Sequence, residues 1–273
     1  MSTTRLKWGD IAADVRPVVE DRTGPIRAVH PVDGGFNSHL AVRLDTDRGS
    51  VFVKGLRSDH PQAWTQQREA AVSRYTAELG PRLLWHAQEA GWDLLGFDFV
   101  EGHHADYAAN SPDINLLADT LTQLATIKAP PVILKKAEER WAGYVDDTSI
   151  LREFSGNTLC HTDFNPENVL IIPRQNRAIL VDWAWSTAGA AWIDPALCIV
   201  WLIATGHRSP EAAESWARRM PAWNSAPVTA VDAFAAANGR LWASIAADNP
   251  GSWSEALRNG ALMWSAYRRT AAG

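Results

Sequence analysis

Residues 159–171 read LCHTDFNPENVLI, a polar loop between two short hydrophobic runs. Each hydrophobic run is typical of a short buried strand. The loop between them carries four short polar side chains, those of His161, Asp163, Asn165 and Asn168. A loop joining two strands is held at a rigid sheet edge, where polar side chains are positioned to meet a ligand. A polar β-turn with capping residues is the alternative interpretation.

A second carboxylate follows the next predicted strand. Residues 178–181 are apolar, and Asp182 comes directly after them. Asp182 can therefore reach the same sheet edge as Asp163 and Asn168. Carboxylate and amide oxygens are hard ligands that suit Mg²⁺, which keeps several waters and depends on substrate phosphates. A carboxylate that is not bound to the metal can accept a proton from a hydroxyl, which is worth about 10²–10⁴ in rate.

Composition restricts the class of protein. The 273 residues fit one large domain or two joined lobes, and 46% hydrophobic with 21% charged residues indicates a globular chain. The net charge of -5 offers no basic footprint for nucleic acid. No signal peptide is visible, and the longest apolar run, 193–205, is shorter than the ~20 residues of a membrane span. We expect a cytoplasmic monomer or weak dimer with no nucleic-acid or membrane partner.

The order of predicted elements indicates an α+β fold. The first part is rich in strands, expected at 27–31, 39–45, 50–55, 81–86 and 92–100, with one helix at 62–79. The later part is mainly helical, with helices expected at 111–127, 194–205, 209–219, 228–247 and 252–271. This pattern predicts a small β-rich lobe over 1–100, a hinge at about 97–106 and a larger, mainly helical lobe over 101–273.

The polar loop resembles the catalytic loop of the kinase fold. His161-Thr162-Asp163, four further residues and Asn168, then Asp182-Trp183-Ala184, reproduce the spacing of the kinase motifs. The middle residue is Thr where protein kinases have Arg. The stretch is therefore more similar to the aminoglycoside phosphotransferase family, which usually has Gly there, and VDWAWSTAGAAWIDPAL at 181–197 resembles that family too. The resemblance covers nearly the whole chain and implies a bilobal protein-kinase-like fold.

The resemblance also implies roles for individual residues. Asp163 resembles the catalytic base, and His161 the residue that braces the catalytic loop. Asn168 and Asp182 resemble the Mg²⁺ ligands. Asp194 is similar to the aspartate that holds the loop backbone, while a helix N-terminal cap is its alternative role.

Two charged residues upstream are candidates for holding the nucleotide. Lys54 in VKGLR resembles the strand lysine that grips the α- and β-phosphates, and Glu69 is our choice for its acidic partner. The alternatives are a surface lysine and a solvated helix charge.

The remaining nucleotide contacts are expected from a loop and from the hinge. Gly34, Gly35 and Ser38 form a candidate phosphate loop, because glycine permits close backbone approach. The full Gly-rich kinase pattern is absent, so a hairpin turn is the alternative. By position alone, the Asp98 carbonyl and the Val100 amide are expected to bind the base. ATP and GTP both remain open as the phosphoryl donor.

The predicted activity is transfer of the nucleotide γ-phosphoryl group to a hydroxyl of a small molecule. The acceptor is expected to be an antibiotic, aminoglycoside-type or nucleoside-type, so that transfer gives resistance or self-protection. Residues 208–269 hold seven arginines against five acidic residues, a balance that does not favour a polycation. The 14 tryptophans are expected to be mainly core residues, with one or two lining an acceptor pocket. A choline- or sugar-like kinase and a non-catalytic nucleotide- or metabolite-binding module are the alternatives.

Overall fold

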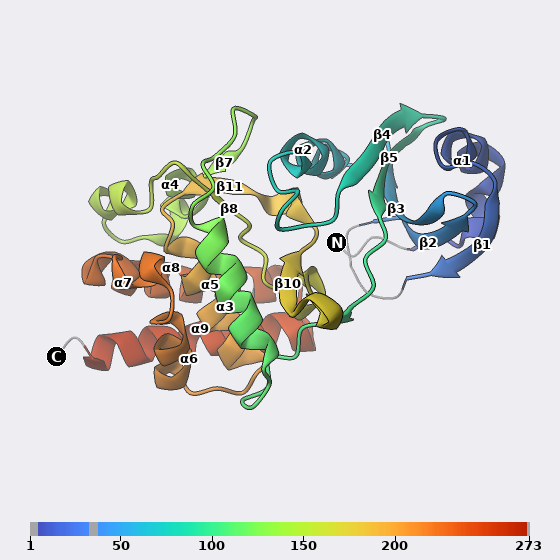
Figure 1. The fold of residues 1–273 in the computed structure, drawn as a ribbon. Coiled ribbons are helices and arrows are strands. Elements are labelled where there is room, and N and C mark those ends of the chain that lie inside the picture. Colours follow the sequence, from blue (N-terminus) through green and yellow to red (C-terminus); the bar gives the residue numbers. More distant parts are fainter. Residues whose placement is uncertain (1–4, 33–37, 272–273) are drawn as a thin grey trace. The chain divides into compact units, whose positions relative to one another are not determined.

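The structure, a computed structural model, describes residues 5–32 and 38–271 (Figure 1). The chain forms two compact units, one of Met1–Gly102 with Leu180–Ala184 and one of His103–Ile179 with Trp185–Gly273. The first is built around a β-sheet and the second mainly from helices, so the predicted α+β class is confirmed. Leu180–Ala184, which contains Asp182, belongs to the sheet-rich unit, and this was not predicted.

The sheet of the first unit has five antiparallel strands in the order β1-β2-β3-β5-β4. Their bounds are β1 Ile26–Pro31, β2 Leu40–Thr46, β3 Gly49–Arg57, β4 Leu83–Glu89 and β5 Trp92–Asp98. All five coincide with the predicted strands to within a few residues. The turn from β4 to β5 uses Ala90 and Gly91 at φ 51° and 75°, the left-handed pair that a tight hairpin requires.

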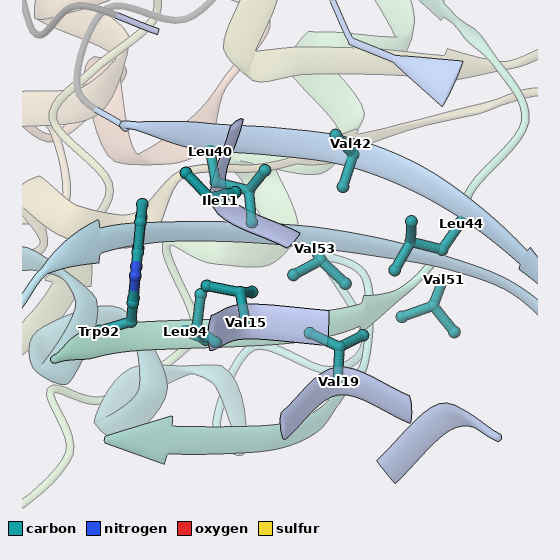
Figure 2. Packing of buried hydrophobic residues seen from close by; sticks show 10 residues of the cluster. All are labelled: Ile11, Val15, Val19, Leu40, Val42, Leu44, Val51, Val53, Trp92 and Leu94. Carbon is teal, nitrogen blue, oxygen red and sulfur yellow. The ribbon is translucent and has the colours of Figure 1, made fainter. Parts of the chain in front are cut away.

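Helix α1 (Trp8–Thr23) covers one face of this sheet and was not predicted. Its buried side chains lie on one side, at four-residue spacing, and pack against alternate residues of β2, β3 and β5 (Figure 2). Pro17 lies inside the helix and removes a backbone donor, which weakens the sequence signal for a helix. The cluster comprises Ile11, Val15, Val19, Leu40, Val42, Leu44, Val51, Val53, Trp92 and Leu94.

The next helix, α2, is shorter than predicted. It spans Trp64–Ser73 rather than 62–79. The chain tightens at its end, where the Tyr75 N–H donates to the Val72 carbonyl and the Ser73 hydroxyl donates to the Glu69 carbonyl. Such local bonds compete with continued α-helix. Glu69 nevertheless lies within α2, as expected.

The second unit contains most of the helices. They are α3 (Asp113–Leu124), α4 (Ala137–Arg140), α5 (Ile193–Ala204), α6 (Pro210–Ala217), α7 (Pro221–Asn224), α8 (Val228–Asp248) and α9 (Ser252–Ala271). Four of these match predicted helices closely, and α3 is shorter at both ends. No helix in the described part of the chain is long and apolar enough to span a membrane.

Two small sheets lie beside the helices and frame the polar loop. One has the order β10-β9-β6, from Arg177–Leu180, Val169–Ile172 and His103–His104. The other has the order β7-β11-β8, from Lys135–Lys136, Thr187–Gly189 and Thr158–Cys160. The loop 161–168 therefore leaves β8 in one sheet and enters β9 in the other, which fixes both of its ends.

Aromatic side chains form much of the core of the second unit. Trp141, Phe154, Trp192 and Phe234 are buried. The ring centroid of Phe234 lies 4.8 to 5.2 Å from those of the other three, and the Phe154 and Trp192 centroids are 5.8 Å apart. Edge-to-face contacts at these separations are favourable. The expectation that most tryptophans are packing residues is confirmed for these positions, and both cysteines are buried and free.

We predict that Leu44→Ala lowers the free energy of unfolding by about 2–5 kcal/mol, because the substitution leaves a cavity in a fully buried cluster. Urea denaturation measures the change. Leu84→Ala on β4 is the matched control, since Leu84 is 39% exposed. A loss at Leu44 no larger than that at Leu84 would contradict the packing shown in Figure 2.

Candidate active site

In the first unit, Lys54 is held between two carboxylates. Its Nζ lies 2.5 Å from Glu69 Oε2 and 3.0 Å from Asp182 Oδ1. The side chains of Lys54 and Glu69 are 9% and 3% exposed, whereas that of Asp182 is 24% exposed. The structure therefore brings together the predicted pair of Lys54 and Glu69 and adds Asp182. Neither a surface lysine nor a solvated helix charge fits this burial.

The charges in this cluster depend on one another. Burial alone would lower the pKa of Lys54, but the carboxylates of Asp182 and Glu69 outweigh it and raise that pKa above its ordinary value. Burial raises the pKa of Glu69 to about 7, and the Lys54 cation acts in the opposite direction. A permanently charged ammonium group is thus fixed in a buried position.

A strained turn presents Asp182. Its φ is 61°, in the left-handed region that Asp tolerates better than most residues. The Leu180 N–H donates to the Leu79 carbonyl, and the Trp183 indole N–H donates to the Leu180 carbonyl. Gly80 lies so close that a Cβ there would meet the Leu180 carbonyl oxygen at 2.8 Å. These contacts attach the turn to the first unit.

In the second unit, Asp194 holds the backbone of the loop. The N–H of His161 donates to Asp194 Oδ2 at 2.8 Å and that of Thr162 donates to Oδ1 at 3.0 Å. Asp194 lies in the first turn of α5 and is buried. Its predicted role in holding the loop backbone is confirmed. Burial raises the pKa of Asp194 to about 7, while the two N–H groups and Arg140 act in the opposite direction.

The loop is also braced from within by His161. This side chain is fully buried, and its Nδ1 accepts the Asp163 N–H at 3.3 Å. The ring centroids of His161 and Phe164 lie 5.4 Å apart. The backbone carbonyl of Phe164 accepts the Tyr107 hydroxyl at 3.1 Å. The half-buried Asp163 therefore projects from a backbone that is fixed on both sides.

The amides at the end of the loop have defined orientations. Asn165 Oδ1 accepts the Glu167 N–H at 3.1 Å and caps the short turn Pro166–Asn168. Asn168 Nδ2 donates to the Asp163 carbonyl at 3.3 Å. Because the nitrogen of the Asn168 amide is directed to the backbone, its oxygen is the atom presented to a ligand.

One residue of this site was missed by the sequence analysis. Arg140 Nη1 lies 2.6 Å from Thr162 Oγ1, 3.1 Å from Thr187 Oγ1 and 3.2 Å from the Trp185 carbonyl oxygen. Arg140 ends the four-residue helix α4, 22 positions before Thr162. Neither spacing nor periodicity connects it to the loop, so no sequence signal could have found it.

The predicted phosphate loop is only partly described. Gly34 and Gly35 lie outside the described residues, and Ser38 is half-buried just before β2. In the predicted hinge, the Asp98 N–H donates to the Arg82 carbonyl at 3.0 Å. Both Asp98 and Val100 are half-buried. Base contacts through the Asp98 carbonyl and the Val100 amide stay a prediction.

The expected metal ligands are one carboxylate, Asp182, and one amide, Asn168. Within residues 5–32 and 38–271, no group of three or more His, Cys, Asp or Glu residues is placed to hold a metal ion. The two expected ligands, Asn168 and Asp182, belong to the second and the first unit respectively. Their role as Mg²⁺ ligands stays a prediction.

Comparison with known proteins places the fold. No protein family and no curated protein matches the sequence. Among solved structures, choline kinase LicA from Streptococcus pneumoniae is similar at a TM-score of 0.64 and 14% identity, over 93% of this chain and 99% of that chain. Aminoglycoside phosphotransferase APH(4)-Ia is similar at a TM-score of 0.64 and 15% identity, over 96% of this chain and 100% of that chain. A thermostable mutant of APH(4)-Ia, in a ternary complex with AMP-PNP and hygromycin B, is similar at a TM-score of 0.63 and 16% identity. The similarity covers 95% of this chain and 99% of that chain.

This chain has the fold of the kinase-like phosphotransferases. The predicted protein-kinase-like fold and the resemblance to aminoglycoside phosphotransferases are thus confirmed at the level of the fold.

The titration of Asp194 predicts a pH effect on stability. Its pKa is about 7 in the folded protein against an ordinary 3.8, so the folded state binds the extra proton between these values. The contribution of Asp194 to the free energy of unfolding should therefore fall as the pH rises towards 7 and stay constant above it. Denaturation of the wild type and of Asp194→Asn, which cannot titrate, at pH 5 to 8 measures this. A difference between the two proteins that does not change with pH would contradict the shift.

Proposed function

We propose that this protein is a Mg²⁺-dependent phosphotransferase that moves the γ-phosphoryl group of ATP or GTP to a hydroxyl of a small molecule. The observation that carries the proposal is the buried Lys54, whose Nζ contacts both Glu69 and Asp182. An ammonium group held charged in this way is suited to bind phosphate oxygens. Structures of the same fold are described with AMP and with AMP-PNP, which supports a nucleotide donor.

The available donor atoms fit Mg²⁺. The carboxylate of Asp182 and the amide oxygen of Asn168 are hard ligands. Because Asn168 Nδ2 donates to the Asp163 carbonyl, the amide oxygen of Asn168 remains available to coordinate the ion. Two protein ligands suffice for an ion that takes its remaining ligands from water and phosphate. When bound, Mg²⁺ would neutralise negative charge on the phosphate oxygens.

In the proposed reaction, the acceptor hydroxyl gives its proton to the Asp163 carboxylate. The hydroxyl oxygen forms a bond to the γ-phosphorus, the bond to the β–γ bridging oxygen breaks, and the nucleoside diphosphate leaves. His161 and Asn168 both contact the backbone of Asp163, and Asp163 Oδ1 accepts the Asn165 N–H at 3.5 Å, so these contacts restrict the carboxylate before the acceptor binds. Orientation of this kind is the main source of rate in phosphoryl transfer.

The proposed acceptor is a hydroxylated antibiotic, and the described carboxylates bear on its charge. In the C-terminal helices, Glu214 accepts bonds from Trp264 and Arg268, and Asp232 accepts a bond from Arg268. Carboxylates neutralised by an arginine attract a polycation poorly. This favours a nucleoside-type compound over a strongly cationic aminoglycoside.

The pairing of Glu214 and Asp232 with Arg268 also supports a second candidate function, a kinase for a metabolite with at most one positive charge. A choline kinase is among the structures of this fold.

The first experiment is a transfer assay with Mg²⁺, γ-labelled ATP or GTP and a panel of aminoglycosides, nucleoside antibiotics, choline and other amino alcohols. A product heavier by one phosphate identifies the acceptor. If no compound gains phosphate while the nucleotide still binds, the result favours either an acceptor outside the panel or the binding-module alternative.

We predict that Asp163→Asn lowers kcat by about 10²–10⁴, because an amide cannot accept the hydroxyl proton. Its size is unchanged, so nucleotide affinity measured by calorimetry should stay within about twofold, as expected for a residue that acts in the transition state. Asp119→Asn, an exposed position on α3, is the matched control. Near-normal turnover of Asp163→Asn would exclude Asp163 as the base.

Lys54→Met should weaken Mg-nucleotide binding by about 10–100-fold, the usual cost of losing a charged hydrogen bond. Calorimetry measures the affinity. A melting curve is needed beside it, because the substitution leaves the buried Glu69 without its cation. Lys136→Met, at an exposed lysine, is the control. Unchanged nucleotide affinity would rule out Lys54 as a phosphate ligand.

A further inference from the structure

Thr162 has a backbone conformation that β-branched residues rarely adopt. Its φ is 66°, in the left-handed region. Glycine reaches this region without steric cost. A threonine at this position therefore needs contacts that hold it in place.

The side chain of Thr162 supplies two such contacts. Its hydroxyl donates to the Trp185 carbonyl at 2.7 Å and accepts from Arg140 Nη1 at 2.6 Å. The Thr187 hydroxyl donates to the same carbonyl at 2.9 Å and also lies 3.1 Å from Arg140 Nη1. The Trp185 carbonyl thus accepts from both hydroxyls and also lies 3.2 Å from Arg140 Nη1, which contacts both hydroxyl oxygens.

The backbone of Thr162 is fixed as well. Its N–H donates to Asp194 Oδ1 at 3.0 Å. With its amide and its side chain both held, the remaining torsions of Thr162 determine the direction in which Asp163 leaves the loop. Contacts to the Thr162 side chain therefore bear on the orientation of the residue that follows it, Asp163.

We propose that Arg140 is a positioning residue for the phosphoryl transfer. Its charge-assisted bond to the Thr162 hydroxyl keeps Thr162 left-handed and so orients the Asp163 carboxylate. The kinetic part of this inference rests on the proposed function, whereas the structural part does not. The arrangement replaces the intrinsic freedom of glycine with a side-chain contact from a distant helix.

A double-mutant cycle tests the proposal. Arg140→Met should lower kcat by about 10–100-fold, the scale of a misplaced catalytic group, and leave the KM for nucleotide within about twofold. In the Thr162→Gly background the same substitution should cost less than about threefold, because glycine keeps the conformation without support. Equal losses in both backgrounds would show that Arg140 does not act through Thr162. Arg174→Met, at an exposed arginine, is the control.

Two substitutions at Thr162 keep the test valid if Arg140→Met does not fold. Thr162→Ser retains the hydroxyl and should keep kcat within about threefold of the wild type, because both hydrogen bonds remain. Thr162→Val retains the shape but loses both bonds, so its kcat should fall as far as that of Arg140→Met. Equal activity of the Ser and Val variants would overturn the proposal.

Amide hydrogen exchange provides a readout that needs no turnover. In the peptide covering residues 159–169, Arg140→Met should exchange faster than the wild type, and the difference should disappear in the Thr162→Gly background. If this is seen while no acceptor is phosphorylated, the positioning contact stands and the proposed function fails. Unchanged exchange on loss of Arg140 would overturn the positioning contact, whatever the activity.

Discussion

The path of the loop 161–168 depends on a buried carboxylate. Asp194 accepts the N–H groups of two successive residues, His161 and Thr162, and so determines the course of the backbone just before Asp163. Buried backbone donors must be paired, and one carboxylate with two oxygens pairs both. Burial of this charge is costly, as the raised pKa of Asp194 indicates. The two N–H groups and the charge of Arg140 offset part of this cost.

The first unit shows the same principle with the opposite charge. Lys54 is buried and charged because Glu69 and Asp182 lie beside its Nζ. Isolated buried charges are unstable, whereas groups of opposite sign that are hydrogen-bonded to one another persist. Glu69 is more deeply buried than Asp182, so the ammonium group is paired with one enclosed carboxylate and one that stays partly exposed.

The left-handed conformation of Thr162 has a physical consequence. A threonine in the left-handed region brings strain, and it also brings a hydroxyl that glycine lacks. That hydroxyl joins Arg140 to the Trp185 carbonyl. A left-handed threonine is unfavourable in an isolated peptide. Here its hydroxyl links the loop to α4 and to the segment beginning at Trp185.

The sequence by itself determined the strands, most helices and the position of the polar loop 161–168. These features depend on local periodicity and on short motifs such as the spacing from His161 to Asn168. Only the tertiary structure showed that Asp182 joins Glu69 beside Lys54, that Arg140 bonds Thr162, and that helix α1 covers the sheet. Those contacts join residues distant in the chain, and no local pattern encodes which distant partners meet when the hydrophobic surfaces pack.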